Sequence, residues 1–227
     1  MTDARPRGRR RLMMAVGLLV AAAVIGIAVG KTADAQTHRA AAARSHPAAT
    51  MDMSGMITSR QLALRNAMRV LWEQHVAWTR LAIVSLAGNL PDLSATEARL
   101  LRNQHDIGAA IVPFYGRAAG HKLTGLLRQH ILIAVRILGD VKSGDSAALK
   151  RDNAAWYANA NRISAFLHAA NPRHWPLAAL RAMMHRHLKL TTNEAVAELT
   201  GKFRASVQAY DQVEHEILGM ADMLSTG

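Results

Sequence analysis

Residues 71–80, Leu-Trp-Glu-Gln-His-Val-Ala-Trp-Thr-Arg, place a histidine where the surrounding pattern calls for an apolar residue. Apolar residues recur around it in alternating steps of four and three, at Leu64, Met68, Leu71, Trp78, Ala82 and Leu86. This spacing is typical of one helix face that packs against other helices. His75 falls in the same register, so the pattern predicts that its imidazole points into a helical core.

The composition favours helices throughout the chain. Of the 227 residues, 50% are hydrophobic but only 4% are aromatic, and alanine and leucine are the commonest types. Strands prefer β-branched and aromatic side chains, whereas alanine and leucine favour helix. The absence of cysteine excludes disulfides, thiolate metal sites and a cysteine nucleophile.

The chain is basic, with 28 Lys and Arg against 16 Asp and Glu and a formal net charge of +12. Part of this excess lies in the first 35 residues, and the rest is spread along the helical segments. No basic run is interleaved with aromatic residues, the arrangement that would favour nucleic acid. We therefore expect a solvated basic surface and no nucleic-acid partner.

Residues 1–35 are typical of a targeting segment. Arginines between Arg5 and Arg11 precede an uncharged apolar run over residues 12–30, and Ala33-Asp34-Ala35 offers a signal-peptidase site before Gln36. The alternative is an uncleaved anchor, because 19 apolar residues approach the length that spans a bilayer. Both alternatives predict an exported protein, periplasmic or on the outer face of the membrane, since the arginines stay inside. Membrane contact is expected only through residues 12–30, if they are retained.

Residues 36–58 lack apolar periodicity and are expected to form a flexible linker. His46, Met51, Met53 and Met56 lie in this polar stretch, where exposed thioethers gain nothing by burial. Thioether sulfur suits Cu(I) and imidazole suits copper in either oxidation state. The segment resembles the Met- and His-rich stretches of exported bacterial copper-handling proteins. The alternative is that these methionines start the first helix or pack on the bundle surface.

The remaining chain, residues 59–227, divides into helices at Gly, Pro and capping residues. We predict an all-α fold, an up-and-down bundle of four main helices plus one or two short ones. The predicted helices span residues 59–87, 94–115, 121–141, 146–170, 177–189 and 192–224, the fifth being short.

Several polar residues fall on or beside the apolar stripes. His75, His130, Asn153 and His187 occupy stripe positions, and Asp211 and His215, four apart, share one helix face. A buried polar group without a partner costs about 1–3 kcal/mol, so such groups on facing helices should meet. They form either a hydrogen-bonded layer that sets helix register or a metal site in the bundle core. The candidate core ligands are His75, Asp106, His130, Asp211 and His215.

Other chemistry has no sequence signal. Glu-x-x-His, the carboxylate pattern of di-iron bundles, does not occur, and no phosphate-loop, dinucleotide or serine-hydrolase motif is present. His185 and His187 project roughly 200° apart on a helix and cannot share a metal there. No catalytic residue is predicted, although an enzyme with an unrecognised core site remains a third hypothesis. The others are a copper-binding bundle and a non-enzymatic structural or interaction module.

Four stretches resemble a family of bacterial helical proteins of unestablished function. They are residues 71–80, Asn103-Gln104-His105-Asp106-Ile107-Gly108, Trp156-Tyr157-Ala158-Asn159 and Met220-Ala221-Asp222-Met223. The resemblance spans roughly residues 60–225 and implies one helical domain. It implies no catalytic residues.

Overall fold

A computed structural model describes residues 59–226, which form six α-helices and no strand. The helices are α1 (Ser59–Ala87), α2 (Leu93–Ala110), α3 (Val112–Ser143), α4 (Ser146–Ala170), α5 (Leu177–Leu199) and α6 (Phe203–Thr226). The all-α prediction is confirmed for this part of the chain. The predicted targeting segment and linker, including His46, Met51, Met53 and Met56, lie outside the described residues. Among the described helices, none is long and apolar enough to cross a bilayer.

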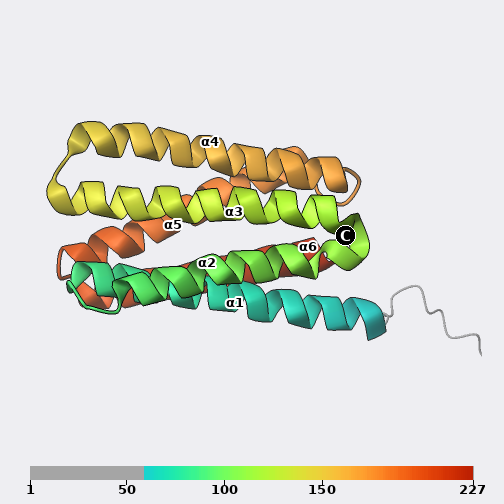
Figure 1. Ribbon diagram of the computed structural model, residues 1–227, viewed down its shortest axis with the longest axis horizontal. Helices are drawn as coiled ribbons and strands as arrows, with labels where there is room; N and C mark the ends of the chain where they lie inside the picture. Colours follow the sequence, from blue (N-terminus) through green and yellow to red (C-terminus); the bar gives the residue numbers. More distant parts are fainter. Residues whose placement is uncertain (1–58, 227) are drawn as a thin grey trace, which may run out of the picture. The chain divides into compact units, whose positions relative to one another are not determined.

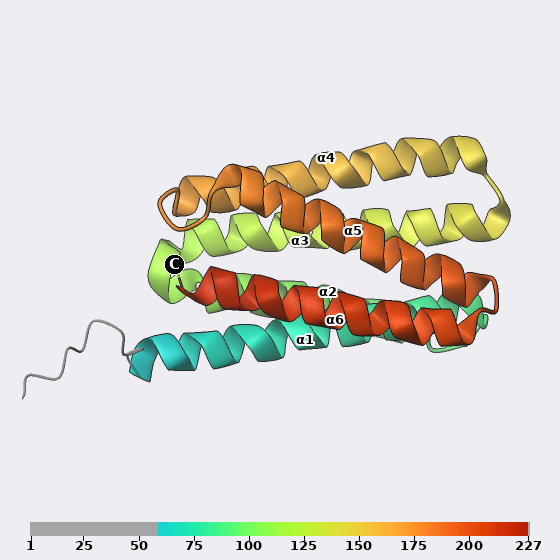
Figure 2. The same ribbon diagram turned by 180° about the vertical axis from the view of Figure 1, so that it is seen from behind.

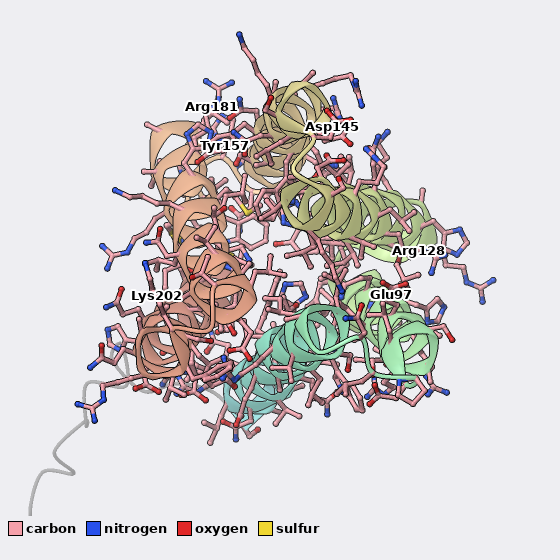
Figure 3. The ribbon with its side chains drawn as sticks, turned by 90° about the vertical axis from the view of Figure 1, so that its left-hand side faces the viewer. Glu97, Arg128, Asp145, Tyr157, Arg181 and Lys202 are labelled. Atoms are coloured by element: carbon pink, nitrogen blue, oxygen red, sulfur yellow. The ribbon has the colours of Figure 1, made fainter. Side chains whose placement is uncertain are left out.

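The helices form a closed ring around one core. Each packs against its neighbours in sequence, and α6 returns to pack against α1. Figure 1 shows α1 to α4 side by side, and Figure 2 shows α5 and α6 on the opposite side, with α5 running obliquely from α4 towards α6. Figure 3 looks along the helices from the end where Asp145 and Lys202 lie. Residues buried at the centre of this ring can therefore come from helices far apart in sequence.

Local chemistry explains where most helices end. Gly144 adopts a left-handed conformation (φ 73°) at the C-terminus of α3, and the Asp145 side chain accepts a hydrogen bond from the Ala148 backbone N–H at the start of α4. Gly201 (φ 70°) separates α5 from α6. Asn171 to Pro176 join α4 to α5, and the Trp175 indole N–H donates to the Met223 carbonyl on α6 (3.3 Å).

Four predicted boundaries were wrong: the end of the second helix, the start of the third, the end of the fifth and the start of the sixth. The sixth helix begins at Phe203 rather than at residue 192, which belongs to α5. The fifth helix does not end at residue 189, because neither Thr191 nor Thr192 breaks it, and the Thr192 hydroxyl donates to the Leu188 carbonyl within the helix (2.8 Å). The six helices span 18 to 32 residues, so α5, with 23, is not a short one. The second helix ends at Ala110, before Pro113 rather than after it. The third begins at Val112 and is interrupted by the non-helical Gly116 (φ 82°, ψ 167°).

Helices α2 and α3 approach so closely that two glycines are required where they cross. A Cβ atom on Gly108 would lie 2.7 Å from the Gly120 carbonyl oxygen and would overlap the Thr124 hydroxyl. A Cβ atom on Gly120 would lie 2.7 Å from the Gly108 carbonyl. Backbone atoms cannot rotate away as side chains do, so a methyl group here must push the helices apart.

We therefore expect Gly108→Ala to lower the free energy of unfolding by about 1–3 kcal/mol, the usual cost of overpacking. Gly125→Ala is the matched control, since it lies on exposed α3 surface and its added Cβ meets nothing within 4 Å. That change should stabilise the helix by about 0.5–1 kcal/mol. Urea unfolding of both variants checks the pair. Equal shifts in the same direction would contradict the close crossing.

Candidate functional site

Three buried imidazoles meet at the centre of the ring. His75 on α1, His130 on α3 and His187 on α5 are each 5% exposed or less. The ring centroid of His187 lies 5.9 Å from that of His75 and 6.3 Å from that of His130. The prediction that His75 and His130 point inward is confirmed, and His187 joins them from a third helix.

Each imidazole has its Nδ1 atom beside a polar side chain of another helix. His130 Nδ1 lies 2.9 Å from Asn159 Oδ1 on α4, and His75 Nδ1 lies 3.1 Å from Gln104 Nε2 on α2. His187 Nδ1 lies 3.4 Å from Glu216 Oε2 on α6. All six helices thus contribute one residue to this layer, which we call the histidine layer.

The partners set which ring nitrogen carries the proton. Asn159 Oδ1 can only accept, so His130 donates through Nδ1 and its Nε2 keeps a lone pair when the ring is neutral. The Asn159 amide nitrogen donates in turn to the Leu126 carbonyl (3.2 Å), which fixes this orientation. Gln104 Nε2 is a donor and also meets the Leu100 carbonyl (2.9 Å). His75 therefore accepts through Nδ1 and carries its proton on Nε2.

Burial keeps two of these imidazoles neutral. Desolvation, reinforced by the His187 ring, lowers the pKa of His130 to about 3. Desolvation and the two other histidines also lower the pKa of His75 well below its usual value of 6.5. The hydrogen bond that His130 donates to Asn159 opposes the shift of its pKa but does not overcome the desolvation. Neutral imidazole is the form that binds metal ions.

Several polar atoms around the histidine layer have no hydrogen-bond partner among the protein's own atoms. The two indole rings that pack on the layer are Trp72, 5.6 Å from His75, and Trp156, 5.2 Å from His130, measured between ring centroids. Both indole N–H groups are unpaired, as are Gln104 Oε1 and both carboxylate oxygens of Glu216. The layer thus holds more donors and acceptors than its own hydrogen bonds satisfy.

The structure does not bring the other predicted core ligands into this layer. Asp211 and His215 lie on the exposed face of α6, so the prediction that they join a buried polar cluster was wrong. Asp106 is 41% exposed in its side chain and lies beside the exposed His105 (3.6 Å). Asn153, placed on the core stripe of α4, is also exposed, because the face of α4 that turns inward carries Asp152, Trp156 and Asn159.

Sequence reasoning missed four residues of the layer as site residues. His187 was placed on a core stripe but not among the candidate ligands, whereas Gln104, Asn159 and Glu216 were not predicted to be buried. Gln104 lies between Asn103, which is also buried, and His105, which is exposed, so periodicity alone did not single it out. Glu216 lies directly beside His215, and one residue along a helix turns the side chain by about 100°. That rotation buries Glu216 and exposes His215.

A second buried polar cluster, the Arg80 cluster, lies between α1, α5 and α6. Arg80 Nη1 donates to Glu194 Oε1 (2.9 Å) and to Ser206 Oγ (3.1 Å), and Ser206 Oγ donates to Glu198 Oε2 (2.6 Å). The guanidinium also lies over the Tyr210 ring, 5.3 Å from its centroid. Burial raises the pKa of Glu194 to about 6, and the hydrogen bond from Arg80 opposes that rise. One arginine thus faces two buried carboxyl groups.

Within residues 59–226, no three His, Asp or Glu side chains are placed as a group that could hold an ion. No family model, no curated protein and no solved structure matches this chain. The resemblance to a family of bacterial helical proteins therefore stays a prediction.

Proposed function

We propose that this chain is an exported metal-binding protein that holds a copper ion at the histidine layer. The observation that carries the proposal is the convergence of His75, His130 and His187 from three helices, with each Nδ1 beside a polar partner. Metal-binding histidines use one ring nitrogen for the ion, and the other meets a carbonyl or carboxylate that orients the ring. His130 has this arrangement, and His187 Nδ1 lies 3.4 Å from Glu216 Oε2 without a hydrogen bond.

The separation of the rings is close to what one ion requires. With metal–nitrogen bonds of about 2.0–2.1 Å, two imidazoles at a tetrahedral angle have ring centroids about 5 Å apart. The observed separations of 5.9 and 6.3 Å exceed this by about 1 Å. The His130 and His187 rings lie nearly parallel, at 27° to one another, so both would have to rotate before their nitrogens could meet one ion. The absence of a preset three-ligand group means that the ion itself must draw the rings together.

His75 differs from the other two rings in this proposal. Its Nδ1 meets the donor Gln104, so its Nε2 carries a proton that has to leave or move before it can bind an ion. His130 and His187 are therefore the primary ligands, and His75 is the third. Glu216, beside His187, offers a carboxylate that offsets the positive charge of the ion.

Copper is favoured over other imidazole-binding metals by the sulfur nearby. Met184 lies one turn before His187 on α5, and Met220 lies one turn after Glu216 on α6; both are buried. Thioethers and imidazoles together suit Cu(I). The linker segment with His46, Met51, Met53 and Met56 has the same chemistry, and we propose that it passes copper to or from the bundle.

Metal analysis of the full chain, purified from copper-supplemented cells, tests this proposal. Changing Met51, Met53 and Met56 to leucine removes the thioether ligands of the linker. In that variant we expect about one copper ion per chain, held by the bundle. His130→Ala and His187→Ala should each weaken binding at least tenfold, and His75→Ala should weaken it less. His215→Ala, an exposed histidine on α6, is the control. A copper content near zero, or one that the core variants leave unchanged, would reject the metal site.

A second candidate function is a purely structural polar layer that fixes helix register. The buried bonds from Gln104 to His75 and from Asn159 to the Leu126 carbonyl favour it, because they pair residues in only one alignment of the helices. This alternative predicts that His75→Leu keeps the fold and stability while copper content stays at zero. Buried polar groups replaced by apolar ones of similar size are often neutral or stabilising.

A further inference from the structure

A separate cavity lies one helical turn from the histidine layer. It has a volume of about 100 Å³, and all fourteen side chains that line it are apolar or aromatic. They come from α1, α3, α4, α5 and α6, from Ile111 between α2 and α3, and from Trp175 before α5. Trp72 lines the cavity and also packs against His75, so the two sites share a wall.

The cavity is closed on all sides but one. Ten of its lining residues are buried, and the four that are not are Leu64, Ile111, Phe114 and Tyr115. These four lie at the start of α1 and at the corner between α2 and α3. The backbone is irregular there, since Ile111 belongs to neither helix and Gly116 is non-helical. The mouth therefore opens at this corner, where the Phe114 ring is 48% exposed.

No charged side chain lines the cavity, and its buried wall exposes no hydrogen-bond donor. The two ring atoms able to donate from the buried wall are indole nitrogens: Trp175 already donates to the Met223 carbonyl, and the Trp72 nitrogen is fully covered by protein atoms. Apolar cavities of about 150 Å³ stay free of water and bind benzene or xenon. At about 100 Å³ this cavity is smaller than those, so it accepts xenon directly and benzene or a short alkyl group as its walls adapt.

We propose that this cavity is a binding site for an uncharged hydrocarbon group, either a small apolar molecule or the end of an alkyl chain that enters beside Phe114. Three methionines, Met68, Met184 and Met220, line it, and their flexible side chains allow the walls to adapt to ligands of different shape. Met184 and Met220 also lie one helical turn from residues of the histidine layer, but no charged or imidazole group lines the cavity, so the site goes beyond the proposed copper function. It stands whether or not the histidine layer holds a metal.

Titration of the full, metal-free chain with xenon and with benzene tests the site. We expect methyl NMR signals of Met184, Met220 and Leu224 to shift with either probe, and the unfolding temperature to rise with benzene concentration. Leu167→Phe, which narrows the cavity, should weaken benzene binding at least tenfold. Leu224→Ala, which enlarges it, should strengthen binding several-fold.

The matched control is Ala134→Val, which fills a smaller apolar cavity of about 40 Å³ lined by residues such as Ile83, Ile137 and Leu199. It should leave benzene affinity unchanged within twofold. Leu167→Phe narrows the cavity and Leu224→Ala enlarges it, so their expected effects on benzene affinity are opposite. If one of these variants fails to fold, the other still tests the site. Benzene affinity that is undetectable, or that does not differ between Leu224→Ala and the unchanged protein, would overturn the proposal. If Leu224→Ala raises the affinity for 1-hexanol more than the affinity for benzene, the ligand is the end of an alkyl chain.

Discussion

Arg80→Ala is expected to lower the free energy of unfolding by about 3–5 kcal/mol at pH 7, the usual cost of removing one partner of a buried ion pair. Arg80 is the cation that faces the buried carboxyl groups of Glu194 and Glu198, which are 1% and 9% exposed. Without it, Glu194 loses a 2.9 Å hydrogen bond and Ser206 loses another. Urea unfolding of the metal-free protein measures the loss.

The control is Arg65→Ala. Arg65 and Arg69 both bind the Asp222 carboxylate near the surface, at 2.9 and 2.7 Å, with the arginine side chains 37% exposed. An exposed pair contributes about 1 kcal/mol or less, and Arg69 remains to hold Asp222. The double variant Arg80→Met with Glu194→Gln should recover part of the loss, because the buried charge that lacks a partner is then removed. Equal losses for Arg80→Ala and Arg65→Ala would show that the Arg80 cluster is not buried as described.

Acid is expected to destabilise the metal-free bundle well before its surface carboxylates titrate. The pKa values of His75 and His130 are lowered in the folded state, so protons bind the unfolded chain first. Stability from these groups is fully present above pH 6.5 and falls as the pH decreases towards about 3, where His130 itself titrates. In that window, each imidazole lowers the free energy of unfolding by about 1.4 kcal/mol for each unit by which the pH falls.

Glu194 acts in the opposite direction. Its pKa is raised to about 6, above the value in the unfolded chain, so its contribution is present at low pH and is lost as the pH rises through 6. Between pH 6 and 4.5, protonation of Glu194 offsets about 2 kcal/mol of the stability that the two imidazoles lose. Hydrogen bonds from Arg65 and Arg69 lower the pKa of Asp222 to about 2, which keeps it charged throughout.

Urea unfolding at pH 6.5, 5.5 and 4.5, in the presence of a chelator, measures this slope. His130→Leu should reduce it by about 1.4 kcal/mol per pH unit, because that variant has one imidazole fewer to protonate in the unfolded state. His215→Leu, which removes an exposed imidazole, should leave the slope unchanged. An unaltered slope in His130→Leu would show that the His130 imidazole is charged or solvated in the folded state.

Periodicity along one helix was sufficient to predict burial where the stripe was regular. His75, His130 and His187 each replace an apolar residue in a run of three- and four-residue steps, and each is buried. Prediction failed where the position lay beside the stripe. Asp211 and His215 are exposed, whereas Glu216 is buried. His215 and Glu216 are adjacent in sequence, so their side chains differ in direction by only one residue's turn of the helix. Hydrophobic spacing does not resolve that rotation when apolar residues occur on both sides.

The partners of the histidines were decided by the tertiary structure alone. His75 meets Gln104 across 29 residues, and His130 meets Asn159 across 29 residues, because neighbouring helices of the ring lie antiparallel. Arg80 meets Glu194 across 114 residues, because α6 packs against both α1 and α5 and so places these two helices next to each other. No local pattern encodes such a distance.

The sequence by itself determined that residues 59–226 form helices, where two of them begin and end, and that three imidazoles point inward. Those properties depend on neighbours within about one turn, through backbone preference, capping and the period of the helix. Only the tertiary structure decided that the imidazoles lie on one level, what each Nδ1 atom meets, and where the apolar cavity lies. These follow from how six helix faces fit together, which depends on every side chain in the core at once.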